Sequence, residues 1–130
     1  MKKIIATDKA PKAVGAYSQG VVAGGFLFIS GQLPIDPATG ELLVGTLRSQ
    51  TTQALRNLEA VCRAAGASLS DAVKVTIYLR DLDDFQEVND AYAAFFPSDP
   101  PARATVQVAR LPRDAGIEIE AIIALPPESR

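Results

Sequence analysis

The sequence contains no histidine among its 130 residues. Histidine is the base of Ser-His-Asp triads and Cys-His dyads and a usual ligand of zinc, so its absence excludes these centres. Any acid or base chemistry must come from carboxylates, tyrosine, lysine or water. If the protein is an enzyme, its catalysis therefore works without an imidazole.

Cysteine is almost as scarce, because Cys62 is the only one. One cysteine cannot form an intramolecular disulfide, so nothing indicates an oxidising compartment. The apolar run Ile4-Ile5-Ala6 after two lysines stops at Thr7, far short of a signal peptide, and no run approaches membrane-spanning length. We expect a cytoplasmic protein with no membrane partner.

The chain has little excess charge, with 13 basic and 15 acidic residues, a net charge of −2 and a pI near 5.1. An acidic total disfavours a nucleic-acid partner, which rewards a basic surface. Apolar residues make up 48% and charged residues 22%, the balance of a folded globular protein. With no repeat or linker, residues 1–130 are expected to form a single domain.

Hydrophobic spacing predicts seven elements in the order β-β-α-β-α-β-β, an α+β arrangement. A helix over residues 47–65 is the clearest, with Thr46 at its start, Gly66 beyond its end and Cys62 on its apolar stripe as a buried, unreactive thiol. A second helix, capped by Asp83 or Asp84, runs to about Phe96. The predicted strands cover residues 20–23, 26–30, 73–80, 103–109 and 117–125.

The predicted sheet is apolar on both faces. Ile119, Ala121 and Ile123 lie on one face of the last strand, but Ile122 and Ala124 lie on the other, and the strand over 26–30 is equally two-sided. Two helices can cover only one face of a sheet. We therefore expect the second face to be buried against other subunits.

Two short motifs before the first helix are candidates for a site. One is the glycine-bounded polar loop 15–20, which includes Tyr17 and could equally be a plain surface turn. The other is Ser30-Gly31-Gln32, where an apolar strand changes to small polar residues. A buried serine that is hydrogen-bonded to the backbone would explain this segment as well.

Two more candidates lie in the last two strands. After two prolines, Arg103 starts a strand and shares one face with Thr105 and Gln107, which suits two-point binding of a carboxylate, although a structural salt bridge is the alternative. Glu118 and Glu120 share a face of the last strand. We expect Glu118 to be solvated and Glu120 to lie in a half-apolar setting that raises its pKa, unless it serves a structural ion pair.

These motifs, in this order and spacing, resemble the RidA/YjgF family, also called the YER057c/UK114 family. The resemblance spans Ile5 through Ile123 and is strongest in three segments: Pro101-Ala102-Arg103-Ala104-Thr105, Val108-Ala109-Arg110-Leu111-Pro112 and Ile117-Glu118-Ile119-Glu120-Ala121. Ser30-Gly31-Gln32-Leu33-Pro34 and Asp81-Leu82-Asp83-Asp84-Phe85 also match. Many members carry cysteine at the position of Thr105, and a proline at that of Ala16.

The resemblance implies a chorismate-mutase-like fold, with a mixed sheet packed on two helices, assembled as a homotrimer with active sites between subunits. It further implies hydrolysis of enamines and imines such as 2-aminoacrylate, 2-iminopropanoate and 2-iminobutanoate to 2-keto acids and ammonia, without metal or cofactor. Arg103 and Glu120 would be the catalytic residues, facing each other across a shared crevice. The substrate-binding residues would be Arg103, Thr105, Tyr17, Ser30, Gly31 and Asn89.

Two other functions stay open on the sequence. A trimer that binds a keto acid without turnover would use Arg103 in the same way, and only Glu120 separates this function from catalysis. Some relatives are described as ribonucleases or translation inhibitors, which the acidic total and the missing histidine disfavour here.

Overall fold

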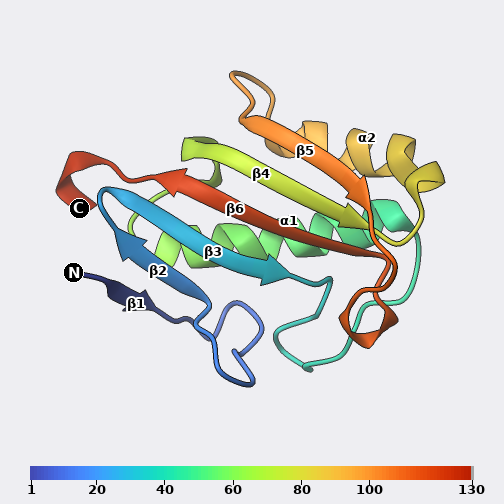
Figure 1. The fold of residues 1–130 in the computed structure, drawn as a ribbon, viewed down its shortest axis with the longest axis horizontal. Helices are drawn as coiled ribbons and strands as arrows, with labels where there is room; N and C mark the ends of the chain where they lie inside the picture. The colour runs from blue at the N-terminus through green and yellow to red at the C-terminus, as the bar shows by residue number, and fades with distance from the viewer. Residues whose placement is uncertain (130) are drawn as a thin grey trace.

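A six-stranded sheet forms one layer of the computed structural model and two helices form the other (Figure 1), with residues 1–129 described. The sheet order is β1-β2-β3-β6-β4-β5, in which only the β4–β5 pair is parallel. The elements are β1 (Lys3–Ile5), β2 (Gly20–Ala23), β3 (Phe26–Gln32), α1 (Leu47–Ala64), β4 (Ala72–Leu79), α2 (Phe85–Phe95), β5 (Ala102–Gln107) and β6 (Ile117–Ala124). The expected α+β fold with a mixed sheet on two helices is confirmed.

Strand β1 is an addition to the predicted order. It has only three residues and pairs antiparallel with β2, with Lys3 opposite Val22 and Ile5 opposite Gly20. Gly24 and Gly25 connect β2 to β3, and both glycines have positive φ, of 61° and 84°. Such dihedrals suit the tight turn between β2 and β3.

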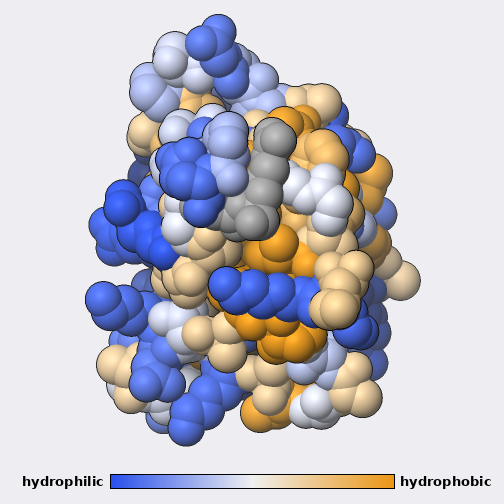
Figure 2. All heavy atoms as spheres, turned by 90° about the vertical axis from the view of Figure 1, so that its left-hand side faces the viewer, coloured by the Kyte–Doolittle hydropathy of each residue, from blue (hydrophilic) through white to orange (hydrophobic). Residues whose placement is uncertain are grey.

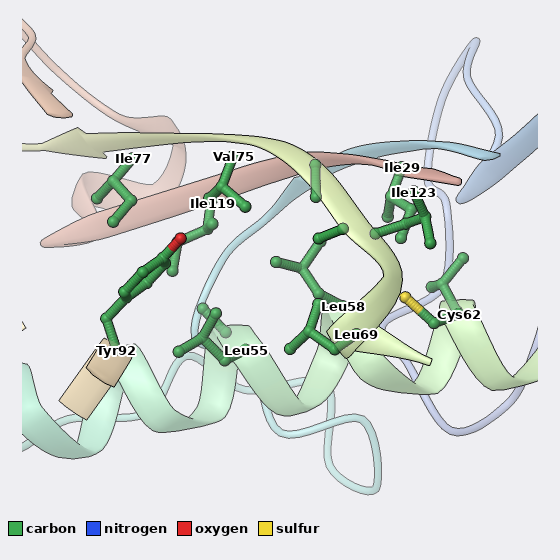
Figure 3. Close-up of a cluster of buried hydrophobic side chains, with 14 of the residues drawn as sticks. Ile29, Leu55, Leu58, Cys62, Leu69, Val75, Ile77, Tyr92, Ile119 and Ile123 are labelled. Atoms are coloured by element: carbon green, nitrogen blue, oxygen red, sulfur yellow. The ribbon is translucent and has the colours of Figure 1, made fainter. Parts of the chain in front are cut away.

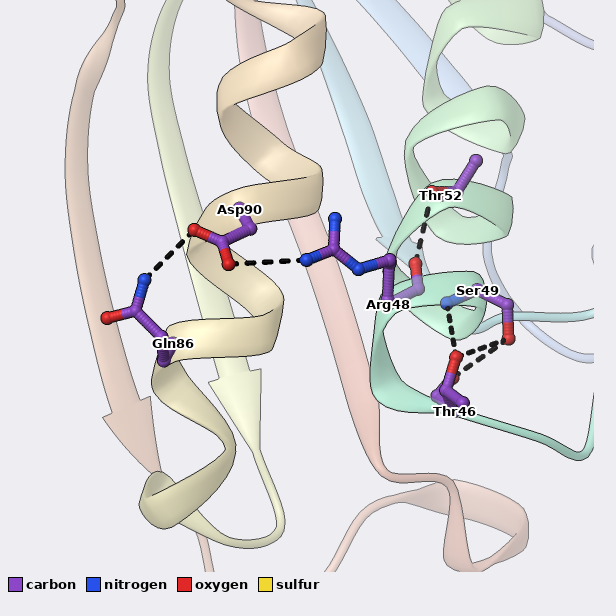
Figure 4. Close-up of polar contacts among 6 residues, drawn as sticks. All are labelled: Thr46, Arg48, Ser49, Thr52, Gln86 and Asp90. Carbon is purple, nitrogen blue, oxygen red and sulfur yellow. Dashed lines mark hydrogen bonds and ion pairs between the residues drawn. The ribbon is translucent and has the colours of Figure 1, made fainter.

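The first helix begins and ends as its sequence predicts. The Thr46 hydroxyl accepts a hydrogen bond from the backbone N–H of Ser49 at 3.1 Å, and Gly66 follows the helix with φ of 80°. Near the start of α1, Arg48 forms an ion pair with Asp90 at 3.2 Å and so links α1 to α2 (Figure 4). No helix within residues 1–129 is long and apolar enough to cross a bilayer.

The second helix starts where the sequence predicts, but the expected capping hydrogen bond is not the one that forms. A short 3₁₀ turn over Leu82–Asp84 precedes α2, and the carboxylate of Asp81 caps it by accepting from the Asp83 N–H at 2.9 Å. Asp84 lies at the N-cap position of α2 but its side chain makes no capping hydrogen bond. The expected N-cap position is therefore confirmed at Asp84, but the capping hydrogen bond comes from Asp81, at the turn that leads into the helix.

The hydrophobic core lies between the helices and one face of the sheet. Figure 3 shows side chains from α1, such as Leu55 and Leu58, packed against Val75 and Ile119 of the central strands. All four are fully buried. Cys62 lies in the same cluster, where burial raises the pKa of its thiol to about 12, as expected of a structural cysteine.

The other face of the sheet has no cover from residues 1–129. Leu27 and Ile29 of β3 face the helices and are buried, whereas Phe26 and Phe28 are 41% and 45% exposed. Figure 2, viewed from the end that holds both termini, shows hydrophilic residues over the helix side and hydrophobic ones gathering toward the sheet side at the right. The two-sided sheet of the sequence analysis is thus present, with one apolar face uncovered in the single chain.

Candidate functional site

A depression of about 350 Å³ lies on the uncovered face of the sheet. Glu120 of β6 and Ser30 of β3 supply polar groups to it, together with Lys74 and Thr76 of β4. Phe28 and Ile122 are among its apolar lining residues. The depression thus places a carboxylate, an amine and a hydroxyl on a partly apolar floor.

Ser30 also fastens the polar loop before β2. Its hydroxyl donates to the backbone oxygen of Ser18 at 2.6 Å, and its N–H donates to that of Gln19 at 2.9 Å. Gln19 is buried and its amide bonds the backbone of Thr7, Ala10 and Pro11. Tyr17 projects from this fixed loop with half of its surface exposed, and it lines a second hollow that includes β1 rather than the depression.

Gly31 has a steric role that the sequence did not reveal. A Cβ at this position would lie 2.7 Å from the Glu118 carboxyl group, so any other residue would displace that side chain from its present place. Gly31 lies in a register shift of the β3–β6 pair, between Ile29 and Gln32. In the structure the Glu118 side chain occupies the space that a side chain at position 31 would need. The expected contact of Gly31 with substrate stays a prediction.

The two glutamates of β6 have the reverse of the expected environments. Glu118 is the half-buried one, and its burial together with the charge of Glu120 raises the pKa of its carboxyl. Glu120 is exposed. The expectation was wrong because Glu118 lies in the space above Gly31, whereas Glu120 lines the depression.

Tyr78 of β4 is a neighbour of these glutamates. Burial, the charge of Glu120 and a hydrogen bond to Glu120 raise the pKa of Tyr78.

Arg103 belongs to a second group of residues between β5 and α2. Its Nη1 donates to Asn89 Oδ1 at 2.9 Å, and its guanidinium carbon lies 4.7 Å from the ring centroid of Tyr92 and 5.6 Å from that of Phe85. Arg103 is half-buried, and none of the ion pairs formed within residues 1–129 includes it. A fixed cation without an acidic partner is suited to binding an anion.

Thr105 lies two residues further along β5 on the same side as Arg103. Its hydroxyl is buried and has no hydrogen-bond partner within the described chain. Backbone amides alternate along a strand, and the N–H of Val108, just beyond β5, donates to Leu79 of β4. The N–H of Thr105, an odd number of residues earlier, is therefore directed to the free edge of the sheet, where a ligand can reach it.

The two groups lie on opposite faces of the sheet. Arg103 pairs in register with Val75, which is buried under the helices, whereas Glu120 pairs with the next residue, Thr76, which lines the depression. Successive residues of a strand point to opposite faces. One chain therefore brings Arg103, Asn89 and Thr105 together, and separately Ser30 and Glu120 with the Tyr17 loop nearby. Residues 1–129 of one chain do not form a crevice that joins Arg103 to Glu120.

Three residues of these groups were absent from the sequence prediction. Lys74 alternates with core residues of β4, so its place beside Glu120 required the register of β6. Phe85 and Tyr92 lie four and three residues from Asn89 on α2, and the helical period could have indicated that they share its face. From the sequence alone, where the position of Arg103 is unknown, both residues are indistinguishable from ordinary packing residues.

The chain resembles a class of small α+β proteins in both its sequence and its fold. The sequence matches the Endoribonuclease L-PSP family over residues 7–125. A RutC family protein of Pyrococcus horikoshii is 54% identical over 94% of this chain and 97% of its own. A 2-iminobutanoate/2-iminopropanoate deaminase of Bos taurus is 48% identical over 94% and 89%. The crystal structure of E. coli TdcF with bound serine superposes with a TM-score of 0.91 at 43% identity, covering 95% and 99%.

The chain belongs to the Endoribonuclease L-PSP family, which is the RidA/YjgF family expected from its motifs. The match covers most of the chain, including both groups of candidate residues. Relatives named as imine deaminases are part of this family, whereas other relatives have only the general name RutC family protein.

Proposed function

We propose that the protein is a hydrolytic deaminase of small 2-imino acids and their enamine tautomers, including 2-aminoacrylate, 2-iminopropanoate and 2-iminobutanoate. The observation that carries the proposal is the Arg103 guanidinium, half-buried, held by Asn89 and unpaired with any acid of residues 1–129. Such a group can bind a substrate carboxylate through two parallel hydrogen bonds. The N–H of Thr105 at the free strand edge would add a third.

The proposed active site is shared between subunits of a homotrimer. One subunit would supply Arg103, Asn89 and Thr105, and its neighbour would supply Glu120 with Ser30 and Tyr17. The uncovered apolar face supports this arrangement, because Phe26 and Phe28 need a cover that residues 1–129 do not provide. Packing that face against other copies would bring the depression around Glu120 to a subunit boundary.

In the proposed reaction, a water molecule attacks C2 of the bound imine, which is protonated on nitrogen, while Glu120 accepts a proton from that water to give a neutral carbinolamine. Glu120 passes this proton to the nitrogen, and the C–N bond then breaks as the hydroxyl gives its own proton to the Glu120 carboxylate and the C=O bond forms. Ammonia leaves and the 2-keto acid remains on Arg103. An enamine substrate is first protonated at C3 to give the imine. Positioning and one acid/base group suffice, because the reacting carbon is already electrophilic.

The test is the decay of freshly generated 2-iminopropanoate in the presence of the protein. Glu120→Gln should lower turnover by about 10²- to 10⁴-fold while 2-oxobutanoate still binds. Arg103→Gln should weaken both binding and turnover. Arg56→Gln, on the exposed surface of α1, is the matched control. Decay no faster than in buffer would overturn the proposed activity.

A second candidate is a trimer that binds a small carboxylate without turnover. Arg103 serves this function equally, and the related TdcF was crystallised with serine. Arg103-dependent binding of 2-oxobutanoate without imine hydrolysis would favour it. The family description names an endoribonuclease, so cleavage of single-stranded RNA by nuclease-free protein should be assayed alongside.

A further inference from the structure

Helix α2 places three side chains against the Arg103 guanidinium. Phe85, Asn89 and Tyr92 lie at intervals of four and three residues, which puts them on one stripe of the helix. Asn89 accepts a hydrogen bond at 2.9 Å, and the two ring centroids lie 5.6 and 4.7 Å from the guanidinium carbon. One helix therefore fixes both the in-plane edge and the face of this cation.

Aromatic rings hold a guanidinium without using its hydrogen-bond donors. The ring faces attract the positive charge, whereas all five N–H groups lie in the guanidinium plane. Asn89 is the one side chain shown to take a donor of Arg103 within residues 1–129. A carboxylate in place of either ring would compete with an incoming anion. The rings steady the cation and leave its donors for a ligand.

Tyr92 is the rigid half of this support. It is 5% exposed, its ring packs on that of Phe96 at 4.6 Å, and it belongs to the hydrophobic core. Its hydroxyl is buried with no hydrogen-bond partner among the described residues, so the contact with Arg103 uses the ring. Phe85 is 39% exposed and approaches from the outer side. Changes at Phe85 can therefore be made with little disturbance of the core.

We infer that Phe85 and Tyr92 are positioning residues that orient Arg103 and thereby set how tightly the substrate carboxylate is bound. This inference rests on the proposed function, in which Arg103 binds that carboxylate. It assigns a role in binding to two side chains that packing alone would otherwise explain. Because they act through Arg103, they should influence substrate affinity more than the chemical step.

The experiment compares Phe85→Leu and Tyr92→Leu with the conservative variants Phe85→Tyr and Tyr92→Phe. Loss of either ring should weaken 2-oxobutanoate binding and raise KM about 3- to 10-fold with a smaller change in kcat. The conservative variants should restore most of the affinity. Phe95→Leu is the matched control, because Phe95 lies on the same helix but is not one of the two rings over the Arg103 guanidinium, and the variant should bind as the wild type does.

A second readout covers the case in which Tyr92→Leu fails to fold. The Arg103 Nε–Hε resonance, identified by its loss in Arg103→Lys, should be shifted by the ring faces and should move in Phe85→Leu. Unchanged resonance and affinity in folded Phe85→Leu would overturn the positioning role alone, because the wild type would still bind 2-oxobutanoate. A wild type that neither binds 2-oxobutanoate nor hydrolyses imines would instead overturn the proposed function, and the positioning role with it.

Discussion

Arg103 and Glu120 lie on opposite faces of the same sheet, although adjacent residues of β4, Val75 and Thr76, are their partners in register. Arg103 faces α2, and Glu120 faces the uncovered side. No rotation of either side chain can bring both groups to one small substrate, because the groups lie on opposite faces and β4 lies between their strands. A site that uses both must combine two chains.

This relationship predicts complementation between two inactive variants. Arg103→Ala and Glu120→Ala should each lose imine hydrolysis alone. Unfolded together at equal concentrations and refolded, they should regain about a quarter of wild-type activity, since a quarter of shared sites would hold both intact residues. Refolded wild type provides the reference value. Recovery absent from a mixture that demonstrably reassembles would show that the two residues do not share a site.

The uncovered face predicts a second outcome, on assembly. Phe28→Glu places a charge among apolar residues that the proposed trimer buries, so sedimentation should report a monomer and imine hydrolysis should fall with it. Arg56→Glu, on the exposed side of α1, should leave the sedimentation coefficient unchanged. A wild type that sediments as a stable monomer at micromolar concentration would contradict the proposed trimer itself.

Much of the fold could be predicted because local patterns and tertiary packing agree. The Leu47–Ala64 helix has an apolar stripe and both end signals, so its sequence and structure coincide. Strand β1 was missed because three residues show no alternation and form a strand only by pairing with β2. The start of α2 was predicted, but the capping side chain was not, because three acidic residues, Asp81, Asp83 and Asp84, offer equivalent caps and the first of them makes the hydrogen bond.

The candidate site was predictable as a set of residues but not as a geometry. The buried alternation of Ile119 and Ala121 indicates that Glu120 points away from the helices. Strand β5 has no such alternation of large apolar residues, so nothing in it indicates the side of Arg103. The burial of Glu118 depends on the missing side chain of Gly31 across the β3–β6 pair, a contact that no single segment encodes.

Gly31→Ala tests whether this glycine accommodates Glu118. The added Cβ would meet the carboxyl group at 2.7 Å and push this flexible side chain out of its present rotamer, so we expect a loss of about 0.5–1.5 kcal/mol in the free energy of unfolding. Chemical denaturation measures the change. Glu118→Ala removes the obstacle, so adding Gly31→Ala to it should cost much less. Equal losses in both backgrounds would show that the two side chains do not compete for this space.

Cys62 should resist alkylation in the native state. It is fully buried, and burial together with nearby negative charge raises the pKa of its thiol to about 12, so almost no thiolate is present at pH 8. Iodoacetamide at pH 8 should leave the folded protein unmodified by mass spectrometry and should modify one site in denaturant. Rapid modification of the folded protein would place the thiol at the surface.

Glu118 should make the folded protein lose stability as the pH rises. Its pKa is raised in the folded chain by burial and by the charge of Glu120, so the folded state binds this proton more tightly than the unfolded state does. Stability therefore falls as the pH climbs from the pKa of the unfolded carboxyl through the higher pKa of the folded one, and the penalty is complete above that value.

Glu118→Gln isolates this effect because the amide has the same shape and no charge. The thermal midpoint of the variant should exceed that of the wild type at pH 7, and the difference should shrink at pH 4, where the wild-type carboxyl is largely protonated. Glu87→Gln, on the exposed surface of α2, should show no such convergence. If the difference in thermal midpoint stayed constant from pH 4 to pH 7, the charge of Glu118 would not destabilise the fold. The carboxyl above Gly31 would then be open to water.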